Sequence, residues 1–149
     1  MGSQTYQRLS QQSLEEHQQI HFYLDQLTRA MQGLNDGVPD LEPIRRLAAQ
    51  IESLRERIDE HFQLEENGGL FQAVLDVIPG AEPEVRRLTS QHQRIVQLLE
   101  MARIRARGSN LDELTLLRDE LDRFLQAMRQ HEREEEALLR RALREDDET

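Results

Sequence analysis

The sequence predicts an all-α protein built as an up-down-up-down antiparallel four-helix bundle. Its 149 residues suit a single domain. The segments between turn signals are rich in Leu, Arg, Glu, Gln and Ala, which favour helix. Within these segments apolar residues recur every three or four positions, which is the spacing of a helix with one buried face. Short connections between such helices favour antiparallel neighbours.

Glycine, proline and asparagine divide the chain at four places. These are MQGLNDGVPD (31–40), NGG (67–69), VIPGAEP (77–83) and RGSN (107–110). We predict helices over about 10–33, 41–66, 83–106 and 110–145, with a short extra turn over 69–77. Residues 1–9 then form an N-terminal tail, 10–145 the bundle and 146–149 an acidic C-terminal tail.

Each predicted helix has one stripe of residues expected to face inward. The stripes are Leu14, His17, His21, Leu24, Thr28 and Met31 in the first helix; Ile44, Leu47, Ile51, Leu54, Ile58, His61 and Glu65 in the second; Val85, Leu88, His92, Ile95 and Leu99 in the third; and Leu114, Leu117, Leu121, Phe124, Met128, His131, Glu135 and Leu138 in the fourth. Start signals support the last three helices. These are Asp40 as N-cap, Pro83 in a first turn, and Asn110 with Glu113 as a capping box.

All five histidines fall on these stripes, together with Glu65 and Glu135. Burying such groups costs several kcal/mol unless they are paired or bind a metal. Because a helix rises about 1.5 Å per residue, antiparallel packing brings all seven to one end of the bundle. Seven ligating groups suit two ions, and imidazole with carboxylate favours iron, manganese or zinc. The carboxylates can bridge the ions while the imidazoles cap them.

The motif His-x-x-x-Glu occurs twice, at 61–65 and at 131–135, and is interleaved with His17 and His92 on the other two helices. This arrangement, over about residues 10–142, resembles the hemerythrin-like, or HHE cation-binding, domain family. The resemblance implies a non-haem di-iron site, with manganese or zinc as less favoured metals. It makes Glu65 and Glu135 bridging ligands, and His17, His61, His92 and His131 terminal ligands.

The pattern departs from the oxygen-carrying hemerythrins, which have a second histidine four residues after the first on the third helix. Here that position is Val96. Helices one and two look like a weak duplicate of helices three and four, and His21 occupies the place equivalent to Val96. We therefore predict His21 as a seventh ligand that saturates one iron and leaves the iron held by His92 and His131 open.

Further residues have candidate roles around the site. Four polar residues that each precede a ligand candidate could orient an imidazole on a neighbouring helix, although an ordinary surface position is the alternative; they are Glu16, Glu60, Gln91 and Gln130. Tyr6 and Tyr23 could act as phenol donors, and Phe22, Phe62 and Leu24 could wall a dry pocket. Four other glutamates are expected on solvated faces, namely Glu66, Glu132, Glu134 and Glu136.

Composition excludes several classes of function. The chain has no Cys and no Lys, so thiol chemistry, disulfides and lysine Schiff bases are excluded. A net charge of −10 argues against nucleic acid or an anionic membrane as partner. No apolar run approaches the length of a membrane span and no signal peptide is visible, so a cytoplasmic protein is expected.

Three functions fit the predicted site. The first is a di-iron protein that binds O2, or NO or peroxide, for oxygen binding, storage or sensing. The second is a di-iron enzyme acting on peroxide, NO or O2, and the sequence leaves open whether the protein is an enzyme. The third is an interaction module that a metal stabilises, with no protein partner indicated. Five histidines against two carboxylates favour the first.

Overall fold

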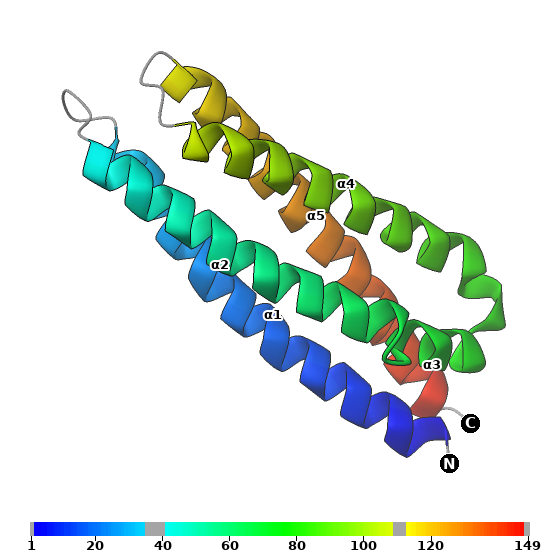
Figure 1. The fold of residues 1–149 in the computed structure, drawn as a ribbon. Coiled ribbons are helices and arrows are strands. Elements are labelled where there is room, and N and C mark those ends of the chain that lie inside the picture. Colours follow the sequence, from blue (N-terminus) through cyan, green and yellow to red (C-terminus); the bar gives the residue numbers. More distant parts are fainter. Residues whose placement is uncertain (1, 35–40, 109–112, 148–149) are drawn as a thin grey trace.

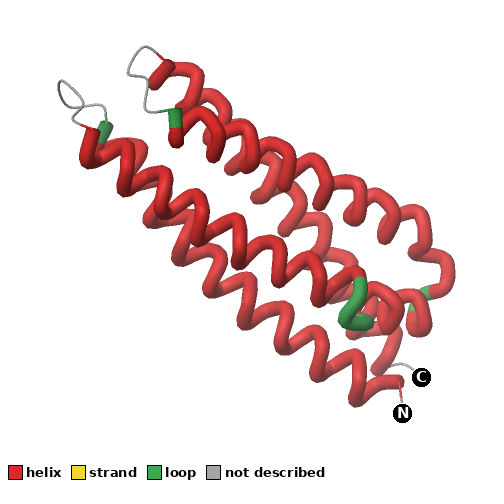
Figure 2. Tube along the Cα trace, in the orientation of Figure 1, coloured by secondary structure: helices red, strands yellow, loops and turns green. Residues whose placement is uncertain are grey.

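The computed structural model describes residues 2–34, 41–108 and 113–147, and over these ranges it contains helices and no strand. The four long helices are α1 (Gly2–Gly33), α2 (Leu41–Glu66), α4 (Glu82–Arg107) and α5 (Leu114–Asp147). A short helix α3 (Leu70–Val77) and a single 3-10 turn η1 (Pro79–Ala81) connect α2 to α4. The long helices lie alongside one another as a bundle, with both chain termini at the same end (Figure 1). Figure 2 shows how little of the described chain is loop.

The bounds of α2 and α4 agree with the sequence prediction to within one residue, whereas α5 begins at Leu114 rather than 110 and extends two residues into the predicted C-terminal tail; the largest difference is at the N-terminus. Residues 1–9 were expected to be a tail, but α1 begins at Gly2, and both Tyr6 and Leu9 are buried. The Tyr6 hydroxyl donates a hydrogen bond to the Leu139 carbonyl oxygen of α5 at 2.5 Å, so tertiary contacts hold the first turns in place. Pro83 lies in the first turn of α4, as predicted. The predicted caps Asp40 and Asn110 lie outside the described residues.

The turn between α2 and α3 depends on a glycine. Gly69 has a φ of +101°, in the left-handed region that glycine enters without a steric penalty. Before it, the backbone N–H groups of Asn67 and Gly68 both donate to the Gln63 carbonyl oxygen, at 2.8 and 3.1 Å. The chain thereby reverses at once, and α3 packs across the end of the bundle beside the first turns of α1 (Figure 1).

The buried side chains form two apolar clusters. The large cluster fills most of the bundle, from Ile20 in α1 to Met128 in α5. The end cluster lies around α3 and joins it to Tyr6 and Leu9 of α1, Leu88 of α4 and Leu138 of α5. On every long helix, buried polar residues separate the two clusters; they are Ser13 and His17 in α1, His61 and Glu65 in α2, His92 in α4, and His131, Glu132 and Glu135 in α5.

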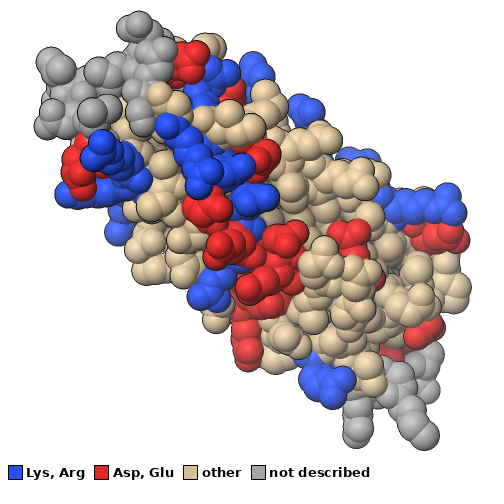
Figure 3. Space-filling model, viewed as in Figure 1, with Lys and Arg blue, Asp and Glu red and all other residues tan. Residues whose placement is uncertain are grey.

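The surface carries charges of both signs. On the face in Figure 3, acidic and basic side chains alternate, and acidic ones gather in one patch over α1 and α2. Among the described residues, no helix combines the length and the apolar character needed to cross a membrane.

Candidate metal centre

The buried polar layer contains two overlapping groups of metal-ligating side chains. One group consists of His17, His61, Glu65 and Glu135, and the other of Glu65, His92, His131 and Glu135. Within each group the ligand atoms lie within 4.8 Å of one another, and every member is buried. The two glutamates belong to both groups. Each long helix therefore contributes one histidine, and α2 and α5 each add a shared carboxylate.

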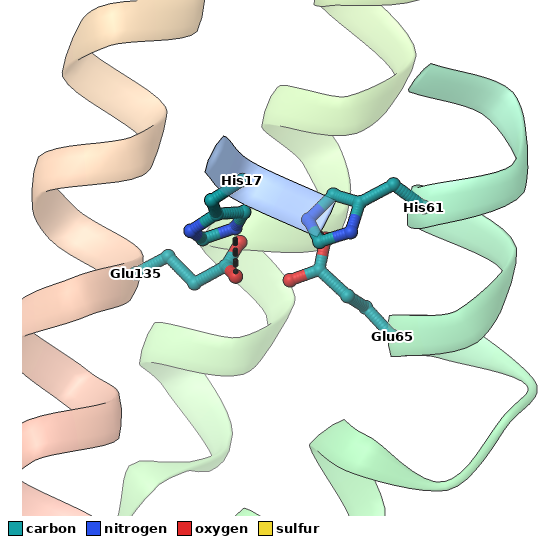
Figure 4. A group of neighbouring side chains, drawn as sticks. All are labelled: His17, His61, Glu65 and Glu135. Atoms are coloured by element: carbon teal, nitrogen blue, oxygen red, sulfur yellow. Dashed lines mark ion pairs between the residues drawn. The ribbon is translucent and has the colours of Figure 1, made fainter. Parts of the chain in front are cut away.

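The first group lies between α1, α2 and α5. His17 Nε2 lies 3.1 Å from Glu135 Oε1, and His61 Nε2 lies 3.2 Å from Glu65 Oε1. Figure 4 shows the two imidazoles and the two carboxylates pointing toward one another.

The second group repeats this arrangement with the other two histidines. His92 Nε2 lies 3.3 Å from Glu65 Oε1, and His131 Nε2 lies 3.0 Å from Glu135 Oε2. The two Nε2 atoms of His92 and His131 are 3.2 Å apart. Glu135 thus directs one oxygen to each group, while Oε1 of Glu65 lies beside a histidine of each group. Both carboxylates therefore lie between the two groups.

Most of these atoms have no hydrogen bond although they are buried. Among the described residues, both oxygens of Glu65 and of Glu135, Nε2 of His61 and both ring nitrogens of His17 lack a partner with hydrogen-bond geometry. For His17 Nε2 and His61 Nε2 the nearest carboxylate oxygens are at 3.1 and 3.2 Å, so the angles, rather than the distances, prevent a hydrogen bond. Leaving so many buried polar atoms unsatisfied is costly. A cation at the point on which their lone pairs converge would satisfy them, so the donor set fits a metal.

Burial favours the neutral, metal-binding form of two of the four imidazoles. Burial lowers the pKa of His61 to about 4 and that of His92 to about 3, so both imidazoles are neutral at pH 7. Burial, together with the charge of Glu135, raises the pKa of Glu65 well above its usual value. Burial acts in the same direction on Glu135, but the close polar groups of Glu65, His131 and His17 outweigh it and lower the pKa of Glu135 well below the usual range. Without a cation the carboxylate pair therefore retains one proton, which a metal would displace.

Each imidazole turns its other ring nitrogen, Nδ1, to an outer polar residue. His61 donates to Glu16 at 3.1 Å and His131 donates to Gln91 at 2.8 Å. Glu16 and Gln91 were two of the four residues predicted to orient an imidazole on a neighbouring helix. The other two, Glu60 and Gln130, are exposed and have no contact to an imidazole among those the structure describes.

Two further glutamates, Glu66 and Glu136, were predicted only as members of solvated faces; they are exposed in part, but each also approaches an imidazole. Glu66 accepts a hydrogen bond from His92 Nδ1 at 2.9 Å, and Glu136 lies 3.9 Å from His17 Nδ1. Each follows a shared glutamate by one residue, just as Glu16 and Gln91 each precede a histidine by one residue. The internal repeat of the sequence was therefore the signal that could have identified them.

The structure does not place His21 with the other six predicted ligands. Its side chain is 51% exposed, and Nε2 pairs with Glu132 at 2.5 Å. The prediction took the i, i+4 step after His17 as inward, but α1 turns Ile20 inward at i+3 and leaves His21 and Leu14 at the surface. Glu132, expected on a solvated face, is buried under His21. Glu134, also expected there, accepts a hydrogen bond from Gln91 Nε2.

Aromatic side chains cover the second group. Phe62 stacks on the His92 ring at a centroid distance of 3.7 Å and an interplanar angle of 8°, and Phe71 stacks at 5.7 Å. Phe62 and Leu24 are buried, as predicted for a dry wall, whereas Phe22 is 60% exposed and was wrongly included. Neither tyrosine contacts the centre in the described structure. Tyr6 bonds to Leu139, and the ring of Tyr23 lies 5.5 Å from the Arg57 guanidinium carbon.

Comparison with known proteins gives one match. The family model of the hemerythrin HHE cation binding domain matches residues 9–143. The search of curated proteins and the search of solved structures gave no match. The matched range covers all six residues of the two groups.

Proposed function

This chain belongs to the hemerythrin HHE cation-binding family, and from that premise we propose that it holds two iron ions and binds O2, or NO or peroxide, between its four long helices. The observation that carries the proposal is the pair of overlapping buried groups that share Glu65 and Glu135. His17 and His61 would hold one ion, His92 and His131 the other, and the two glutamates would bridge them.

The proposal assumes that the four long helices alternate in direction. In an up-down-up-down antiparallel order, His17 and His61 lie at one level on either side of the first turn, and His92 and His131 do so around the last. Each half of the chain then supplies two histidines and one glutamate. This order accounts for the twofold repetition of the contacts.

The protein's own residues would perform three tasks. Neutral imidazoles present Nε2 lone pairs, and the outer residues Glu16, Glu66 and Gln91 hold the rings in orientation through Nδ1. The carboxylates of Glu65 and Glu135 supply negative charge to offset the ions and release their shared proton as metal binds. Phe62 and the large apolar cluster exclude water and bulky reductants. Iron, when bound, supplies open coordination positions for a small molecule.

A di-iron enzyme acting on peroxide, NO or O2 is the second candidate, and the position of His21 favours it. Without His21 the set has four imidazoles to two carboxylates, rather than five to two. A larger carboxylate share stabilises higher oxidation states of iron, which supports turnover rather than reversible binding.

Metal analysis combined with optical spectroscopy tests these alternatives. Two irons per chain, with bands that bleach on anaerobic reduction and return with O2, would support reversible binding. Two irons with irreversible oxidation, or rapid loss of added peroxide, would support the enzyme. One ion or none would contradict the two-metal site. Manganese or zinc in place of iron would retain the site and change its chemistry.

The cytoplasmic location of the protein stays a prediction.

A further inference from the structure

The four imidazoles differ in the charge of the residue at Nδ1. Three of these residues are glutamates: Glu16 at His61, Glu66 at His92 and, at the longer distance of 3.9 Å, Glu136 at His17. The fourth is Gln91, whose neutral amide oxygen accepts the hydrogen bond from His131 Nδ1 at 2.8 Å. The internal repeat places Gln91 opposite Glu16, so an amide stands where symmetry would put a carboxylate.

Gln91 is held in this orientation. Its Nε2 donates to Glu134 Oε2, and the other oxygen of Glu134 pairs with Arg87 Nη2 at 2.7 Å. Because the amide nitrogen is engaged by Glu134, the amide oxygen is the atom left for His131. The Glu134 carboxylate is thus separated from His131 by the Gln91 side chain, and Arg87 neutralises its charge.

The number of carboxylates at Nδ1 differs between the two groups. The group of His17 and His61 has two glutamates there, whereas the group of His92 and His131 has one glutamate and one amide. The buried Glu132 also lies near His17 but pairs with His21, and Glu136 pairs with Arg140 as well. The count at Nδ1 therefore places more carboxylate charge around a dication in the first group than in the second.

We infer that the two metal positions, although each has two histidines and the same two glutamates, bind metal with unequal affinity. The position of His17 and His61 fills first. The position of His92 and His131 fills second, and Gln91 is the positioning residue that sets the difference. The physical reason is that a carboxylate at Nδ1 makes an imidazole a more basic ligand, whereas an amide fixes its orientation without adding charge. This inference rests on the proposed two-metal site.

Exchanging the carboxylate and the amide tests the role of Gln91 at constant net charge. The double variant Gln91→Glu, Glu134→Gln places a carboxylate at position 91, beside His131 Nδ1. It leaves an amide at position 134 that can bond to that carboxylate. Metal-free protein is titrated with Co2+ and followed by visible absorption. In the parent protein we expect two distinct steps. In the double variant the second step should tighten by about tenfold and approach the first, which should not move.

Two further variants complete the test. Glu134→Gln alone is the matched control and should leave both steps within about threefold of the parent. Glu16→Gln, which acts on His61, should weaken the first step by about tenfold and not the second. This variant keeps the inference testable if the double variant does not fold.

Four outcomes would overturn the inference. The first is two binding steps of equal affinity in the parent protein, and the second is an unchanged affinity of the second step in the double variant. The third is an equal gain in that affinity in the control Glu134→Gln, and the fourth is a weaker second step in Glu16→Gln. Two ions bound in a single step would leave the proposed function standing, whereas fewer than two bound ions would overturn both.

Discussion

A histidine that binds a cation must stay unprotonated, and burial achieves this for His92. Its pKa is lowered from the usual 6.5 to about 3, first by burial and then by the neighbouring His131. A lowered pKa means that the unfolded chain binds a proton that the folded chain does not. This contribution to stability is therefore complete above about pH 6.5 and is lost as the pH falls toward 3.

The pH dependence of unfolding tests this assignment. For metal-free protein, His92 should lower the free energy of unfolding by about 1.4 kcal/mol for each pH unit within that window. The variant His92→Gln lacks the titrating imidazole, so its free energy of unfolding should fall less steeply between pH 6 and 4.5. Urea unfolding at several pH values gives both slopes. Parallel slopes would mean that His92 is not buried in its neutral form.

Glu65 has the opposite linkage. Burial and the charge of Glu135 raise its pKa, so its contribution to stability is present at acidic pH and is lost as the pH rises through the raised value. In metal-free protein, Glu65→Gln should raise the free energy of unfolding at pH 8 by about 1–4 kcal/mol while abolishing metal binding. Thermal unfolding and metal analysis check the two effects. The exposed Glu60→Gln on the same helix should change neither, and a Glu65→Gln protein that still binds two ions would exclude a bridging role.

Sequence reasoning reached the central residues because each is chemically out of place on an apolar stripe. His17, His61, Glu65, His92, His131 and Glu135 were all predicted, and the structure brings all six together. His21 was misplaced because both i+3 and i+4 steps continue a helical stripe, and only packing decides between them. Glu66 lies on a polar face, where a glutamate gives no signal of its own.

At the scale of the helix, the stripes of α2 and α4 are buried as predicted, and that of α5 is buried except at the half-buried Leu114. In α1 the inward line instead passes through Ser13, His17, Ile20, Leu24 and Leu27. The first turns of α1 could not be predicted because the segment GSQTYQ (2–7) has low local helix preference, and its conformation depends on tertiary contacts.

Removing the Tyr6 hydroxyl tests how those first turns are held. Tyr6 is fully buried, and its hydroxyl makes the bond to Leu139. Tyr6→Phe should lower the free energy of unfolding by about 1–2 kcal/mol, because the ring remains but the buried hydrogen bond from the hydroxyl to the Leu139 carbonyl is lost. Tyr23→Phe is the matched control and should cost less than about 0.5 kcal/mol, because Tyr23 is half-buried and its ring still faces Arg57. Equal effects in chemical denaturation would mean that the Leu139 bond adds nothing.

At the scale of the whole molecule, the polar layer interrupts an otherwise continuous core. Along α1, α4 and α5, the ligand candidates lie between the large cluster and the end cluster. Of the buried residues that the structure describes, 21 belong to the large cluster and 13 to the end cluster. This boundary includes buried polar atoms that lack hydrogen bonds, among them the four carboxylate oxygens of Glu65 and Glu135. We therefore expect metal to join two regions of unequal stability.

Hydrogen exchange with and without metal measures this coupling. Metal that binds only the folded state stabilises it by an amount that grows with the logarithm of the metal concentration divided by the dissociation constant. This stabilisation is about 4 kcal/mol when the metal concentration is a thousand times the dissociation constant. Chelation should therefore speed exchange everywhere, but most in α3, the first turns of α1 and the last turns of α5, since the smaller cluster can open without disrupting the larger one. Readdition of metal should restore protection in these segments. A uniform change along all four long helices would show that the bundle opens as one unit and that the polar layer is not a boundary between two regions of stability.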